Sequence, residues 1–304
     1  MEEWRKAPGV FWASLSPPCL WLGVFFVAPL SLVWVFSFGS KSGITDIEFG
    51  WTLANYARAA QPLYLGIFLK SLWIAGATTL VCLAVGLPMA LVISFASARA
   101  QPWLLLLIIL PFWTNLLIRT YALIAALRGN GHVNAALEWL WRAGDGALAV
   151  IGLGDYHLLG TGFAPLEILY TDSAVVTGLV YVHLPFMVLP LYAALDRMDR
   201  SLIEASLDLG AGHLRTFLFI IAPLALPGIV SGIIITFIPA LGAYLTPDLL
   251  GGTSSQMIAN VIERQFKSAN DWPFGAALSF LLMYITFFGL AMRSLLSNGR
   301  GGAA

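Results

Sequence analysis

The sequence is poor in charged residues. Asp, Glu, Lys and Arg make up only 11% of its 304 residues, whereas soluble domains carry about 25%. Hydrophobic residues account for 59% of the chain, and the mean hydropathy is +0.83. Because so few charged side chains leave a water-soluble globule short of polar surface, the composition indicates an integral membrane protein.

Several other features are scarce or absent. The formal net charge is zero, which gives no reason to expect nucleic-acid binding. The two cysteines, Cys19 and Cys82, have no spacing typical of a disulfide framework or a metal site. The sequence contains no G-x-x-x-x-G-K-[ST] loop and no nucleophile–base pair, so we expect no ATPase or other catalytic site on this chain.

The sequence is made up largely of apolar runs that are long enough to cross a bilayer. They predict an all-α membrane domain (18–296) with six transmembrane helices at about 18–39, 70–96, 103–127, 173–195, 224–250 and 275–296. Six spans place both termini on one side, and basic residues are about twice as dense there, which favours cytoplasmic termini. Residues 1–17 are interpreted as an interfacial segment or a frayed terminus, and 297–304 as a C-terminal tail.

The loop at 196–223 is more than a linker. Ser201-x-x-Glu204 fits a capping box, and Gly210 fits a left-handed helix end. A second helix is predicted from about 213 to 222, with Pro223 as its boundary. One face of the first helix carries Leu202, Ala205, Ser206 and Leu209. Such a face can rest on lipid headgroups or insert into a groove of a partner, and the pattern alone leaves both open.

This loop resembles the EAA loop of ABC importer permeases, EAA-x3-G-x9-I-x-L-P. Glu204-Ala205, Gly210, Ile220 and Pro223 match at the family's spacing, with Ser206 and Ala222 as substitutions. The resemblance implies a coupling helix that docks on an ATPase subunit, with ATP and Mg bound by that subunit and no cofactor on this chain. The residues implied in coupling are Ser201, Glu204, Ala205, Ser206, Asp208, Leu209, Gly210 and Ala211.

Four further segments resemble permeases of spermidine/putrescine importers: 109–123, 178–199, 237–252 and 271–279. The resemblance implies a type I ABC importer permease fold in the bacterial inner membrane. It also implies three kinds of partner: a second, homologous permease in a heterodimer, two ABC ATPase subunits and a soluble substrate-binding protein. The implied cargo is a polyamine, with another small cationic or zwitterionic solute as the alternative. An ion-coupled secondary transporter is a weaker alternative, because neither repeated halves nor paired intramembrane carboxylates are visible.

The third span carries a charge at membrane depth. Asn115 and Arg119 lie four residues apart, which puts them on one face of a continuous helix, with Trp113 and Tyr121 nearby. A buried charge is expensive and faces a cavity or a partner. Arg119 therefore lines the translocation pathway or the permease interface, or else acts as a structural anchor.

The fifth span is rich in helix breakers. Because Pro and Gly recur from Pro227 to Pro247, we expect a broken helix that forms a pathway wall. Asp248 can attract an ammonium group and Tyr244 can offer a cation–π face. The alternative for Asp248 is a role in the next external turn.

Overall fold

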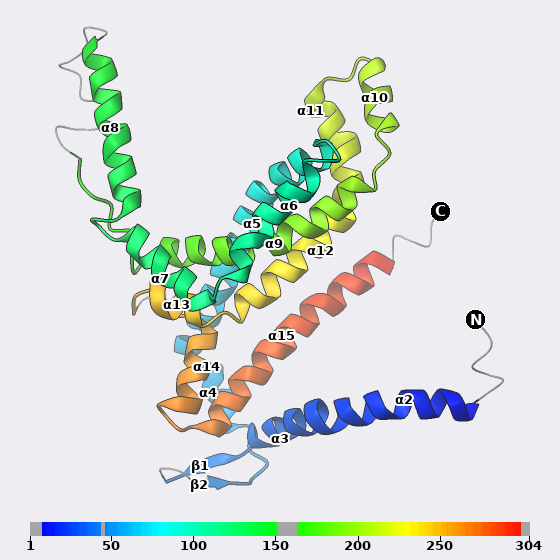
Figure 1. Cartoon of the computed structure of the whole chain (residues 1–304). Coiled ribbons are helices and arrows are strands. Elements are labelled where there is room, and N and C mark those ends of the chain that lie inside the picture. The colour runs from blue at the N-terminus through cyan, green and yellow to red at the C-terminus, as the bar shows by residue number, and fades with distance from the viewer. Residues whose placement is uncertain (1–7, 44–45, 151–162, 254, 299–304) are drawn as a thin grey trace. The chain divides into compact units, whose positions relative to one another are not determined.

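The computed structural model describes residues 8–43, 46–150, 163–253 and 255–298. It divides into two units, one formed by 1–66 with 261–304 and the other by 67–260, each described here by itself (Figure 1). Residues 1–7 of the predicted N-terminal segment and 299–304 of the predicted C-terminal tail lie outside the described residues. They include Arg5, Lys6 and Arg300, three of the basic residues on the side of the termini.

The described chain is helical apart from one short hairpin, which agrees with the predicted all-α class. Within the described residues, five helices are long and apolar enough to cross a membrane: Gly9–Phe36, Pro62–Phe95, Asp172–Asp196, His213–Leu241 and Trp272–Ala291. A sixth span is formed if the bent pair Gln101–Trp113 and Leu116–Ala143 is counted as one. The first helix starts about ten residues before the predicted boundary at 18, with Pro17 and Pro18 inside it.

The first unit contains α2 (Pro8–Leu22), η1 (Gly23–Val27), α3 (Ala28–Phe36), α4 (Ala54–Ala59) and α15 (Trp272–Asn298). Strands β1 (Ser40–Ser42) and β2 (Asp46–Glu48) pair antiparallel, with Lys41 opposite Ile47. Arg58 of α4 forms a 2.8 Å ion pair with the mostly buried Asp271, directly before α15. Its guanidinium also lies 4.0 Å from the ring centre of Phe274, so a charge pair and a cation–π contact fasten α4 to α15.

The second unit contains most of α5 (Pro62–Phe95), and its other helices are α6 (Gln101–Ile109), η2 (Leu110–Trp113), α7 (Leu116–Leu127), α8 (His132–Val150), α9 (Asp172–Asp196), α10 (Ser201–Asp208), α11 (His213–Thr216), η3 (Phe217–Ile221), α12 (Ala222–Leu241) and α13 (Leu245–Leu250). Helix α14 (Ile258–Lys267) begins in this unit and ends in the other.

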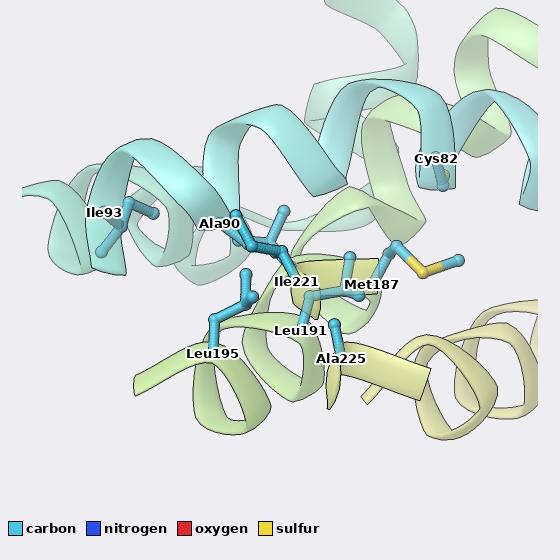
Figure 2. Packing of buried hydrophobic residues seen from close by; sticks show 9 residues of the cluster. Cys82, Ala90, Ile93, Met187, Leu191, Leu195, Ile221 and Ala225 are labelled. Atoms are coloured by element: carbon cyan, nitrogen blue, oxygen red, sulfur yellow. The ribbon is translucent and has the colours of Figure 1, made fainter. Parts of the chain in front are cut away.

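Helices α5, α9 and α12 meet in an apolar core that contains Met187 and Leu191 of α9 (Figure 2). Glycines let α12 approach α9 closely. A Cβ on Gly228 would lie 2.6 Å from the Cβ of Ala194, and one on Gly232 would lie 2.7 Å from Sδ of Met187. This Gly-x-x-x-Gly spacing therefore serves helix packing within the subunit.

Pro223 does not end a helix, so that prediction is wrong. The helix runs from His213 to Leu241 and widens into the π-turn η3 directly before Pro223, where the N–H of Ala222 donates to the carbonyl of Phe217. A five-residue hydrogen bond relieves the clash between a proline ring and the carbonyl four residues earlier. The same arrangement precedes Pro29, where Ala28 donates to Gly23.

The third span is not one continuous helix, contrary to the prediction. Thr114 and Asn115 are extended, with ψ of 147° and 137°, and the two helices on either side meet at a bend of 94°. The fifth span is broken as predicted, but only once. Helix α12 continues through Pro227 and Pro239 and ends at Gly242, after which α13 begins at Leu245.

Candidate functional site

The α10–α11 hairpin, residues 201–216, joins α9 to α12. In Figure 1 it lies at one end of these two helices, while α7 and α13 lie at the other end. At that other end the backbone N–H of Tyr170, just before α9, donates to the carbonyl of Leu250 in α13 at 3.0 Å. The predicted coupling residues and the predicted pathway residues of the second unit therefore lie at opposite ends of it.

The beginning of α10 differs from the predicted capping box. The N-cap is Arg200, without a side-chain hydrogen bond, and the carboxylate of Asp199 accepts the backbone N–H of Ser201 at 2.9 Å. That hydrogen bond, together with one from the Ser201 hydroxyl, lowers the pKa of Asp199. Glu204 is exposed in the first turn, where its charge is favourable to the helix dipole. The acidic cap was missed because it precedes the Ser-x-x-Glu pattern.

The end of α10 is as predicted. Gly210 adopts a left-handed conformation, with φ of +81°. The N–H of Gly210 donates to the carbonyl of Leu207 at 2.9 Å, and the N–H of Ala211 donates to the carbonyl of Ser206 at 3.1 Å. These two bonds form a Schellman motif, which satisfies the last carbonyls of α10 and reverses the chain.

The predicted apolar face of α10 is divided, because Ser206 on it is buried while Leu202, Ala205 and Leu209 on it are exposed. Ser206, predicted on the apolar face, is buried, and its hydroxyl bonds to that of Thr216 in α11 at 2.9 Å. Leu202 and Leu209 are exposed, Leu209 to 89%. Of the remaining implied coupling residues, Ser201, Ala205 and Asp208 are exposed and Ala211 is half-buried. The hairpin is closed on its inner side and presents leucines outward.

Arg119 lies directly after the bend in the third span and is buried. Its Nη2 donates to the carbonyls of Thr114 at 2.8 Å and of Phe112 at 3.4 Å. The guanidinium also lies 5.8 Å from the ring centre of Tyr181 in α9. Arg119 thus satisfies carbonyls that the break would otherwise leave without partners. Asn115 is the N-cap of α7: its side chain accepts the N–H of Leu117, and its carbonyl accepts the N–H of Arg119 at 3.1 Å.

The other predicted pathway residues are all exposed: Trp113, Tyr121, Tyr244 and Asp248. Tyr244 is the N-cap of α13 and its carbonyl accepts the side-chain amide of Asn260 at 2.8 Å. Asp248 lies in the first turn of α13. Because α13 packs against α7 and α9, both broken spans meet at this end of the unit. Asn260 of α14, whose side-chain amide binds the carbonyl at the second break, was missed because it lies between the predicted spans.

Comparison with known proteins identifies the family. The family model described as "binding-protein-dependent transport system inner membrane component" matches residues 8–299. This chain belongs to that family. It is therefore a multi-pass inner-membrane component of a transport system, as the sequence predicted.

Individual family members match over most of the chain. The spermidine/putrescine transport system permease protein PotB of Escherichia coli K12 is 40% identical over 265 residues, covering 87% of this chain and 90% of PotB. The corresponding protein of Haemophilus influenzae is 39% identical over 85% of this chain and 84% of its own length. The inner membrane ABC transporter permease protein YdcU of E. coli is 30% identical over 93% of this chain and 92% of YdcU.

The fold is that of an ABC transporter permease. A chain in the crystal structure of a bacterial ABC transporter involved in the import of alginate matches with a TM-score of 0.69 at 16% identity, covering 96% of this chain and 98% of the other. A second alginate transporter structure gives the same TM-score at 15% identity, covering 95% and 96% of the two chains. At such low identity the likeness shows the fold alone.

The described residues of this family member hold no group of three or more His, Cys, Asp or Glu side chains suited to a metal ion. The candidate functional sites are therefore the α10–α11 hairpin at one end of the second unit and the two helix breaks at its other end.

Proposed function

We propose that this chain is a permease subunit of an ATP-driven polyamine importer. The observation that carries the coupling role is the α10–α11 hairpin, a short helix closed by a Schellman motif with outward leucines at 202 and 209. An amphipathic helix of this kind fits a hydrophobic groove on a partner. The hairpin docks on an ABC ATPase at the cytoplasmic face, and both termini lie on that side.

The ATPase subunits supply the chemistry. They bind ATP and Mg, and this chain carries no cofactor. A second, homologous permease completes the pathway as a heterodimer, and a soluble binding protein delivers the solute from outside. Closure of the two ATPase subunits moves the hairpins and thereby switches the pathway between its inward-facing and outward-facing states.

The polyamine cargo is inferred from the named relatives. Two of them, at 40% and 39% identity, are called spermidine/putrescine permeases. The exposed Tyr244 and Asp248 at the second helix break offer an aromatic face and a carboxylate to an ammonium group. Another small cationic solute is the second candidate, because the YdcU relative covers 93% of this chain and its name gives no solute.

One experiment tests both class and cargo. The complex is co-purified with its ATPase, reconstituted in lipid and assayed for ATP hydrolysis with the binding protein carrying spermidine, putrescine or an unrelated solute. We expect stimulation by a polyamine. Stimulation by another solute alone contradicts the cargo, and failure to co-purify with an ATPase contradicts the class.

A matched pair of variants tests the docking face. Leu209→Asp places a charge on a side chain that is 89% exposed, and Leu166→Asp does the same at a 52% exposed leucine ahead of α9. Exposed substitutions have little effect on folding. We expect Leu209→Asp to abolish ATPase association and Leu166→Asp to leave it intact. Equal association of both variants would remove the leucine face from the interface.

A further inference from the structure

The carboxyl end of α5 is held by two side chains from other parts of the second unit. The last carbonyls of a helix have no partner within it. The carbonyl of Ser94, one residue before the end of α5, accepts a hydrogen bond from Nη2 of Arg200 at 2.8 Å and another from Nε2 of Gln101 at 3.2 Å. Gln101 is the first residue of α6 and Arg200 is the N-cap of α10, so three helices meet at one oxygen atom.

Arg200 joins two helices through two different groups. Its backbone carbonyl accepts the N–H groups of Ile203 at 3.0 Å and Glu204 at 3.2 Å, which starts α10. Its guanidinium caps α5 and lies 5.6 Å from the ring centre of Phe95. A cation at a helix C-terminus is favoured by the helix dipole, and hydrogen bonds from a charged donor are stronger than those between neutral groups.

Apolar packing reinforces this connection. Ile203 of α10 and Met198, just before it, pack against the core cluster that contains Ile93 of α5. Covalently, the hairpin is continuous only with α9 and α12. The Arg200–Ser94 hydrogen bond adds a directional contact to these apolar contacts, which by themselves permit sliding.

We propose that Arg200 is a positioning residue that makes the α10–α11 hairpin move together with the end of α5 and the start of α6. The proposal rests on the proposed function, in which an ATPase displaces the hairpin. Through Arg200 that displacement drives four helices of the second unit instead of two. The residue acts through the Ser94 carbonyl and touches neither ATP nor solute.

The test compares three variants in the reconstituted complex: Arg200→Ala, Arg200→Lys and Arg99→Ala. Arg99 is the matched control, because it is exposed in the same α5–α6 corner and no hydrogen bond or ion pair is found for it in the described structure. ATPase co-purification, stimulated ATP hydrolysis and solute uptake are measured, and the ratio of solute imported to ATP hydrolysed is the readout.

We expect Arg200→Ala to assemble with the ATPase but to lower this ratio by about fivefold or more, the lower end of ordinary coupling between two sites. Arg200→Lys should recover part of the ratio, because an ammonium group still donates to a carbonyl. Arg99→Ala should leave it unchanged. A ratio unaffected in Arg200→Ala, or lowered as much in Arg99→Ala, overturns the proposal. Failure of the proposed function is distinguishable, since the wild-type complex would then lack ATPase.

A distance measurement tests the joint movement directly and covers the case in which Arg200→Ala assembles poorly. In a chain with the exposed Cys19 replaced by serine, spin labels are attached at the exposed positions Ala98 and Leu214. When Arg200 is present, we expect the distance between the two labels to be the same with and without ATP. In Arg200→Lys or Arg200→Ala, we expect this distance to change when ATP is added. A distance that already changes with ATP in the chain that retains Arg200 refutes the proposal.

Discussion

Replacing Gly210 by serine should loosen the turn at the end of α10 without any steric clash. A Cβ at this position meets nothing within 4 Å, so the whole cost comes from the backbone, whose φ is +81°. The left-handed conformation costs an L-residue roughly 1–2 kcal/mol. That energy corresponds to a decrease of about 5- to 30-fold in the equilibrium constant for closing the turn.

Gly212 supplies the matched control two residues later. A Cβ there also meets nothing within 4 Å, but φ is −73°, which serine adopts without strain. Serine is in addition a favoured N-cap, and Gly212 is the N-cap of α11. The same side chain is thus introduced into the same hairpin, at a left-handed position in one variant and at an unstrained position in the other.

Hydrogen exchange measured by mass spectrometry reports the effect locally. The N–H of Ala211 is protected by its bond to the carbonyl of Ser206. In Gly210→Ser, exchange of the peptide that contains Ala211 should accelerate by about 5- to 30-fold, matching the expected strain. In Gly212→Ser it should stay at the wild-type rate. Equal exchange in the two variants would refute the argument that backbone strain at Gly210 controls the hairpin.

Three further outcomes are expected. Arg119→Met should lower stability in detergent by about 1.5–3 kcal/mol, because the Thr114 carbonyl loses a charged donor; a thermal midpoint equal to wild type would contradict this role. Gly228→Ala should cost about 1–3 kcal/mol through overpacking against α9, whereas Gly76→Ala, where a Cβ meets nothing within 4 Å, should be neutral or stabilising in the same melt. The pKa of Asp199 is lowered in the folded state. Its cap should therefore stabilise the fold at pH values above the ordinary aspartate pKa, about 3.9. This stabilisation should be lost as the pH falls through the lowered pKa of the folded state. The difference in melting temperature between wild type and Asp199→Ala should therefore disappear at low pH, and a constant difference would exclude this cap.

The apolar spans could be predicted well from sequence because the bilayer imposes one requirement, a long helix with few charges. Length and composition do not reveal where a helix bends. The break in the third span lies at Thr114 and Asn115, although neither of these residues is a proline or a glycine. Pro223 predicts a helix break, yet the helix continues, because the π-turn before it accommodates the proline ring.

In the candidate site, too, local features could be predicted from the sequence and contacts between distant residues could not. The Gly210 turn was predictable, because a left-handed helix end has a local residue preference. The contacts of Arg200 with Ser94 and of Asn260 with Tyr244 were not predictable, since each joins residues far apart in the sequence. Arg119 was recognised as an expensive charge, but only the bend supplied the carbonyls that it binds.

The sequence alone indicated that the chain lies in a membrane and that the loop at 196–223 carries a short helix ended by a glycine turn. Composition, local turn preference and motif spacing are properties of neighbouring residues, and these were enough. The tertiary structure decided which carbonyls Arg119 and Arg200 satisfy, which face of α10 is buried and where the spans break. Those outcomes depend on how distant segments pack, because a buried polar group accepts whichever partner the fold brings within hydrogen-bonding distance.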